Sequence, residues 1–280
     1  MLYNLAMKRR PTEGDWLPLA RTPRSATGDP TGEAFRCEWI DFERGIRVGH
    51  LEPHERITQI LKFNLERRHG TVFVIDRWGR GVYWQWICWL PKANRQAKPV
   101  SGGANFGCAK LFISIDRGGR VFQSGLQVER GQVTGTVYPG THLEEDWDWH
   151  RLLGQCRKGS DLDRELARLI SRERFVAEIG DFENNLVLDR GSYTSAAQLA
   201  AAARRIAPDR FGGFQLYYPM PSSELRDCSG FELVKAVLAV FAEVTPAMNL
   251  CMQVPLDVPR SAQAPRGDSR ALRAGPAEGP

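Results

Sequence analysis

A stretch rich in lysine, arginine and glycine offers the clearest chemistry in the sequence. It reads PKANRQAKPVSGGANFGCAK and spaces Lys92, Arg95 and Lys98 three residues apart. Two glycines follow, and they allow a ligand to approach backbone amides closely. The GK[ST] ending of a P-loop and the GxGxxG pattern are both absent. The pattern predicts phosphate contacts by Lys92, Arg95, Lys98 and Lys110, with a solvated loop as the alternative.

The segment before this loop, VYWQWICWLP, contains three tryptophans. Exposed tryptophan beside lysine and arginine can stack bases while the cations neutralise phosphate. The alternation of a strand predicts that Trp84 and Trp86 point into the core on one side with Cys88, and that Trp89 points the other way. Trp89 is therefore the one tryptophan of this strand considered for ligand contact, although a core position is favoured for it too.

Carboxylates on a predicted hairpin suggest a second chemistry. Asp116, then Gln127 and Glu129, loosely follow the order in which some nucleases place Mg²⁺ ligands. Such sites also carry a lysine two residues after the acidic position. It is missing here, because Arg130 directly follows Glu129. Asp116 also stands where hairpin turns normally place Asp. A turn-forming role is favoured, and metal-dependent phosphodiester cleavage is kept as an alternative function.

The segment THLEEDWDWH repeats metal-binding residue types every four positions, at His142, Asp146 and His150. On a helix these three span about 12 Å, too far for one ion. Six widely spaced cysteines include no CxxC pair and read as buried hydrophobes. No signature of a serine, cysteine or zinc hydrolase is present. We expect neither a metal nor a cofactor, and the sequence does not decide whether the protein is an enzyme.

The elements that must position these residues begin with a helix over residues 52–69, where apolar residues recur at helical spacing. Two strand-like runs follow over 71–79 and 82–91. Residues 108–128 then form a hairpin, because Gly118 and Gly119 separate two further strand-like runs. The first half of the core is predicted to be a helix and an antiparallel sheet.

Helix caps mark the second half of the chain. Ser160 with Asp163, and Ser229 with Glu232, each stand before an apolar helical stripe. Short strand-like runs separate these helices. We therefore predict an α+β fold: an antiparallel sheet with a β-hairpin in the first half of the core, and mixed helices and short strands in the second half.

Composition divides the chain into four regions. Residues 1–34 and 258–280 are rich in Pro, Gly and Arg without apolar periodicity, and are predicted to be disordered tails. Residues 35–140 form the helix plus antiparallel sheet. Residues 141–257 form an α+β region that belongs either to the same domain or to a closely packed second one.

Composition and charge place the protein among soluble globular proteins, with 42% hydrophobic residues and a net charge of +5. No apolar run is long enough to suggest a membrane span, and MLYNLAMKRR has its charges after its apolar stretch, the reverse of a secretory signal. We expect a cytoplasmic protein. Residues 76–130 contain nine Lys or Arg against three Asp or Glu, whereas residues 131–190 contain eight against twelve. The first region is therefore basic and the second acidic.

The basic region leads to the functional prediction, a soluble binding module for nucleic acid or another polyanion centred on residues 77–130. The alternatives are the metal-dependent phosphodiesterase and a protein-interaction or structural component without a small-molecule site. The sequence indicates no particular protein partner. The predicted nucleic-acid-binding residues are Arg77, Arg80, Trp89, Lys92, Arg95, Lys98, Lys110 and Arg130.

Overall fold

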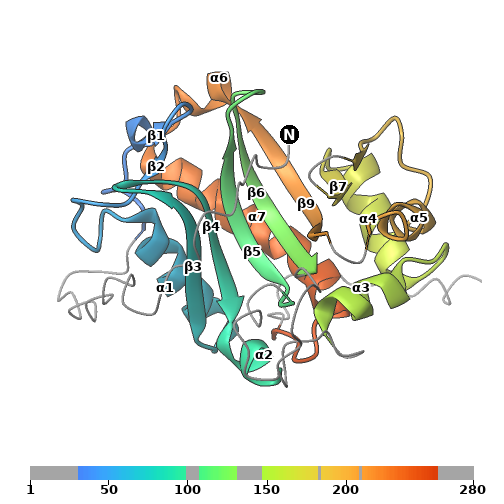
Figure 1. The fold of residues 1–280 in the computed structure, drawn as a ribbon. Coiled ribbons are helices and arrows are strands. Elements are labelled where there is room, and N and C mark those ends of the chain that lie inside the picture. The colour runs from blue at the N-terminus through green and yellow to red at the C-terminus, as the bar shows by residue number, and fades with distance from the viewer. Residues whose placement is uncertain (1–30, 99–106, 131–146, 182–183, 208–209, 258–280) are drawn as a thin grey trace, which may run out of the picture.

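The computed structural model describes residues 31–98, 107–130, 147–181, 184–207 and 210–257. Within them lie seven α-helices and one nine-stranded antiparallel sheet (Figure 1). The elements in chain order are η2 (Cys37–Trp39), β1 (Ile40–Asp41), β2 (Gly45–Arg47), α1 (Ile57–His69), β3 (Phe73–Arg80), β4 (Tyr83–Pro91), α2 (Lys92–Gln96), β5 (Lys110–Asp116), β6 (Val121–Arg130), α3 (Asp148–Gln155), α4 (Asp161–Ser171), β7 (Val176–Gly180), β8 (Asn185–Leu188), α5 (Ala197–Ala203), β9 (Gly212–Pro221), α6 (Ser222–Leu225) and α7 (Gly230–Cys251).

The sheet joins the two halves of the chain. Its order is β1-β2-β4-β5-β6-β9-β7-β8, and β3 pairs with β4 outside this path. The central pairing is between β6 and β9, whose register runs over ten positions from Val121↔Pro221 to Arg130↔Gly212. The predicted α+β class is confirmed, and strands from residues 35–140 and 141–257 share one sheet. The predicted tails at 1–34 and 258–280 lie outside the described residues, except for positions 31–34.

Local signals explain where several elements begin and turn. The β5–β6 hairpin closes on Asp116, whose side chain accepts hydrogen bonds from the backbone N–H groups of Gly118 and Gly119 at 3.0 and 3.1 Å. The Ser160 side chain caps α4 as predicted. A complete capping box between Ser229 and Glu232 opens α7.

Helix α1 begins later than predicted. Residues 52–55 form a turn that is stabilised by the Glu55 carboxylate, which accepts from the Glu52 N–H at 2.8 Å. The helix therefore starts at Ile57. The basic loop also differs from its prediction, because Lys92–Gln96 form the short helix α2.

The sheet has two chemically different faces. On one face the aliphatic side chains of the central strands, such as Ile113, Leu126 and Leu216, join the main core with residues of α1, α4 and α7. Figure 1 shows α1 and α7 behind the sheet in this arrangement. The opposite face has a small apolar cluster of Cys88, Leu90, Phe112 and Tyr217. We call this second face the polar face, because most of its other central residues are polar.

Helix α7 is the central helix of the main core. It is long and apolar enough to cross a membrane by length and composition alone, which the sequence had not led us to expect. Half of the residues in its most apolar 18-residue stretch are buried within the protein. Val237, Phe241 and Val244 belong to the core. A cytoplasmic location stays a prediction from the sequence.

A bulge corrects the predicted orientation of the tryptophans on β4. The register with β3 shifts between Trp78, which faces Trp86, and Gly79, which faces Trp84. An extra residue at a bulge reverses the side-chain alternation. Trp84 accordingly packs against the main core, whereas Trp86 packs on the polar face. The prediction that both point the same way was wrong.

Candidate functional site

A row of four polar side chains crosses the centre of the polar face. Lys110 on β5 stands opposite Gln127 on β6, Gln127 opposite Gln215 on β9, and Gln215 opposite Glu178 on β7. We call these four residues the polar row. Each keeps 5% or less of its surface exposed. Buried polar groups are costly unless they are hydrogen-bonded, so the partners of this row decide what it can do.

One end of the polar row is fully connected. The Lys110 ammonium forms a buried ion pair with Glu129. Gln127 Nε2 donates to Glu129 Oε1 at 2.7 Å, and Gln127 Oε1 accepts from Trp86 Nε1 at 2.6 Å. Burial by itself would lower the pKa of Lys110, but the Glu129 carboxylate outweighs it and raises that pKa. This end therefore keeps its charges and holds the Trp86 indole in place.

The other end of the polar row has an unused donor. Gln215 Nε2 is buried and has no hydrogen-bond partner. Its neighbour Glu178 is hydrogen-bonded to Tyr217, and burial raises the pKa of the Glu178 carboxyl. An unmet buried donor costs about 1–3 kcal/mol. A ligand group that accepted this hydrogen bond would remove the cost.

Aromatic residues flank the polar row. Trp78 and Trp86 are directly opposite each other on β3 and β4, and Trp78 is 39% exposed. Lys110 Nζ lies 5.6 Å from the centre of the Trp86 ring. Gly125 leaves the face without a side chain beside Tyr217, its partner in the β6–β9 register. The polar face thus places aromatic rings beside hydrogen-bonding side chains, two kinds of group that ligand sites combine.

Two of the predicted binding residues lie deep in the protein. Trp89 has no exposed surface; its Nε1 donates to the Thr58 carbonyl at 3.1 Å, and its ring packs against Phe241. Lys98 forms an ion pair with Asp148 at 2.9 Å, and both side chains are completely buried. The solvated loop that the sequence allowed as an alternative does not extend to Lys98, whose burial is compensated by an oppositely charged partner.

The Lys98–Asp148 pair belongs to a network that joins distant segments. Asp148 Oδ2 accepts from Asn94 Nδ2 at 2.7 Å and from the Ala109 N–H at 2.6 Å. The backbone N–H of Gln253, beyond α7, donates to Asn94 Oδ1 at 3.1 Å. The network ties α2, α3, β5 and the end of α7 together. The network has a structural role, because Lys98 and Asp148 each have several partners within the protein.

The remaining predicted residues occupy separate places. Arg77 lies with its guanidinium 4.0 Å from the Trp84 ring centre, and Arg130 donates to the carbonyls of Ala207 and Arg210. Arg95 is half-buried on α2, whereas Arg80 and Lys92 are exposed. The structure brings only Lys110 of the eight into the polar row.

The carboxylates of the phosphodiesterase alternative are separated. Asp116 is engaged in the hairpin turn at one end of β5, whereas Glu129 is near the far end of β6, where it pairs with Lys110. His142 and Asp146 lie outside the described residues, and His150 is on α3. The described part of the chain contains no group of three His, Cys, Asp or Glu arranged to hold a metal ion.

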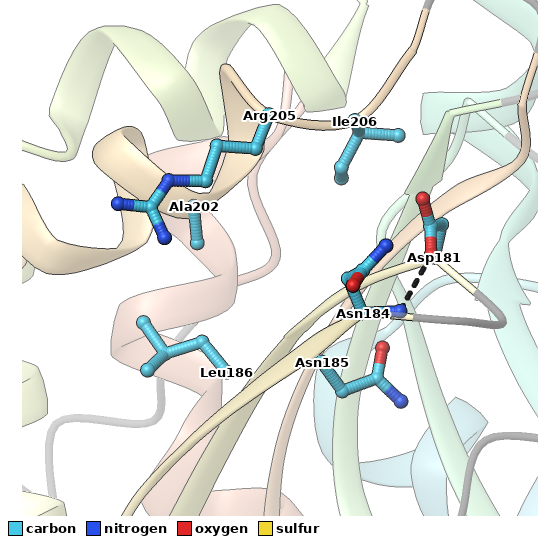
Figure 2. A pocket seen from close by; sticks show the side chains of 7 residues that line it. All are labelled: Asp181, Asn184, Asn185, Leu186, Ala202, Arg205 and Ile206. Atoms are coloured by element: carbon cyan, nitrogen blue, oxygen red, sulfur yellow. Dashed lines mark hydrogen bonds between the residues drawn. The ribbon is translucent and has the colours of Figure 1, made fainter.

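A pocket near β8 is a second place to consider (Figure 2). It is lined by residues of the β7–β8 turn, β8, α5 and the segment after α5: Asp181, Asn184, Asn185, Leu186, Ala202, Arg205 and Ile206. The Asp181 carboxylate accepts from the Asn184 N–H at 2.8 Å, so it serves the turn itself. We regard the polar row as the stronger site, because there a buried donor lacks a partner.

Sequence reasoning missed Gln215 and Glu178 and considered Gln127 only as a metal-site residue. A usable signal was present in the strand VFQSGLQVER, where Phe122, Leu126 and Val128 alternate with polar residues. Such alternation indicates a strand with one polar face.

Comparison of the chain with protein-family models, with curated proteins and with solved structures finds no match.

Proposed function

We propose that this protein is a binding protein that holds a polar ligand on its polar face, against the polar row. The observation that supports the proposal is the buried Gln215 Nε2, which lacks an acceptor while the adjacent Gln127 has both a donor and an acceptor partner. Native proteins rarely leave buried polar atoms unpaired, and such an atom needs an explanation. A bound ligand is the explanation that also uses the aromatic residues beside it.

Binding is better supported than phosphodiester cleavage, because Glu129 is held by Lys110 and Gln127 while Asp116 is used in a turn. Binding of nucleic acid or another polyanion through residues 77–130 stays a prediction. It has less support than the polar face, since Lys98 and Lys110 are paired with carboxylates and Arg130 with backbone carbonyls.

Thermal unfolding tests the proposal. The full chain is screened against a library of small uncharged polar compounds, in parallel with Gln215→Leu. We expect at least one compound to raise the melting temperature of the wild type, because a ligand that binds only the folded state stabilises it. The same compound should not raise that of Gln215→Leu.

Ser124→Ala is the matched control for this screen. Ser124 Oγ is also buried without a partner, but Ser124 is opposite Ile113, on the face that packs into the main core. The control should respond to the compound as the wild type does. If no compound in the library raises the melting temperature in a way that depends on Gln215, the result contradicts the proposal and favours a protein-interaction role.

A further inference from the structure

The polar row limits the chemistry of a ligand through two neighbouring groups. Gln215 and Glu178 are directly opposite each other on β9 and β7, so their side chains start about 5 Å apart. Gln215 Nε2 requires an acceptor. The neighbouring Glu178 carboxyl is hydrogen-bonded to Tyr217, and a carboxyl group has a second oxygen that can accept a further hydrogen bond. A hydroxyl group serves both sides, because it accepts from the amide and donates to the carboxyl.

Charge on the polar face disfavours an anionic ligand. Asp76 lies on this face opposite Cys88, and Glu129 and Glu178 add two further carboxyls. The cation of the polar row, Lys110, is already paired with Glu129. A phosphate or carboxylate could accept from Gln215, but it would meet the Glu178 carboxyl at the same place. A cationic ligand would suit Glu178 and leave the Gln215 donor unmet.

An aromatic surface leads to this donor. The Trp86 Nε1 is bonded to Gln127, which is the neighbour of Gln215 in the β6–β9 register. Trp86 is half-buried, and Trp78 beside it is more exposed. The flat face of an indole packs well against the C–H surface of a ring. A ring on Trp86 that carries hydroxyl groups would therefore direct one of them toward Gln215.

A peptide added as an extra strand does not fit this position. Strand addition requires the free backbone groups of a sheet edge. The polar row crosses β6 and β9, which are paired with each other over ten positions and with β5 and β7 on their other sides. Recognition here must be carried out by side chains.

We infer that the ligand of the polar face is an uncharged saccharide, whose hydroxyl bridges Gln215 and Glu178 while a sugar ring packs on Trp86. This inference rests on the proposed function and specifies its ligand. It uses the Gln215 donor, the neighbouring Glu178 carboxyl and the half-buried Trp86 indole.

Calorimetric titration of the full chain with neutral oligosaccharides tests the inference. The probes are cellohexaose, maltohexaose, fully N-acetylated chitohexaose and xylohexaose. We expect one of them to bind the wild type and Ser124→Ala equally, and to bind Gln215→Leu about tenfold more weakly or worse, because its hydroxyl loses the amide donor. A second variant, Trp86→Phe, should weaken the same probe while keeping an aromatic ring in the sheet.

Two further probes separate the ligand class from the binding function. Adenosine and a blocked triglycine amide are titrated in the same way. If the saccharides fail and one of these binds with dependence on Gln215, the saccharide inference is overturned and the proposed function stands. If a saccharide binds Gln215→Leu as tightly as the wild type, the inference is also overturned. If no probe and no library compound depends on Gln215, both fail.

Discussion

Gln127 and Gln215 are directly opposite each other on β6 and β9, yet only Gln127 has partners for both ends of its side-chain amide. Gln215 Nε2 is equally deep in the protein and donates to nothing. Two identical side chains on adjacent strands therefore differ in what they contribute. Gln127 contributes to the folded structure, whereas Gln215 is a cost to it until an acceptor arrives.

Opposite changes in stability are expected from removing these two amides. Gln215→Leu should raise the free energy of unfolding by about 1 kcal/mol, because it removes an unmet buried donor. Gln127→Leu should lower it by about 1–3 kcal/mol, because Trp86 Nε1 and Glu129 each lose a partner. Urea unfolding of both variants measures the difference. Equal destabilisation by the two would contradict the unequal hydrogen bonding.

The buried ion pair is expected to dominate the stability of the α2 region. Lys98→Met should cost about 3–5 kcal/mol, because it leaves the Asp148 carboxylate buried without its cation. Lys92→Met, at an exposed position on α2 (Lys92–Gln96), should change stability by less than about 0.5 kcal/mol. Denaturant titration compares them. A mild effect of Lys98→Met would show that the pair is solvated.

Two tryptophans on opposite faces should differ sharply in their contribution to stability. Trp89→Ala should cost about 3–5 kcal/mol, since its ring is fully buried against Phe241. Trp78→Ala should cost far less, because the side chain is 39% exposed. Thermal unfolding distinguishes them. A larger loss for Trp78→Ala would reverse the assignment of the two faces.

The ionisation of Glu178 should make stability depend on pH. Burial raises its pKa in the folded protein above the ordinary value of 4.5, so the folded state favours the protonated carboxyl. This contribution to stability is fully present below pH 4.5 and is lost as the pH rises through the raised pKa. As the pH rises from 4.5 through the raised pKa, the melting temperature of the wild type should therefore fall relative to that of Glu178→Gln. A constant difference between them would contradict the shift.

The sequence predicted the fold class and several local structures, because those depend on neighbouring residues. The hairpin at Asp116 and the caps at Ser160 and Ser229 are set by contacts within three residues. Alternation along β4 was read correctly from Trp86 to Leu90 but not through the bulge between Trp84 and Trp86. A bulge depends on how two strands meet, which one strand alone does not show.

The polar row could not have been predicted as a site. The four residues of the polar row lie on four different strands. In the sheet, β9 lies between β6 and β7, although it is the last strand along the chain. Only this order brings Gln215 between its two neighbours. The ion pair between Lys98 and Asp148 could not have been predicted either. The two residues are 50 positions apart in the sequence and were counted in two oppositely charged regions.

The most direct measurement of the central claim follows the side-chain amide of Gln215 by NMR. The full ¹⁵N-labelled chain is titrated with the four oligosaccharides, and the Gln215 NH₂ signals are assigned by their loss in Gln215→Leu. The proposed site predicts that these signals shift on titration and that those of Gln59, a glutamine on α1, do not. Unchanged Gln215 signals under saturating ligand would contradict the claim that this amide donates to the ligand.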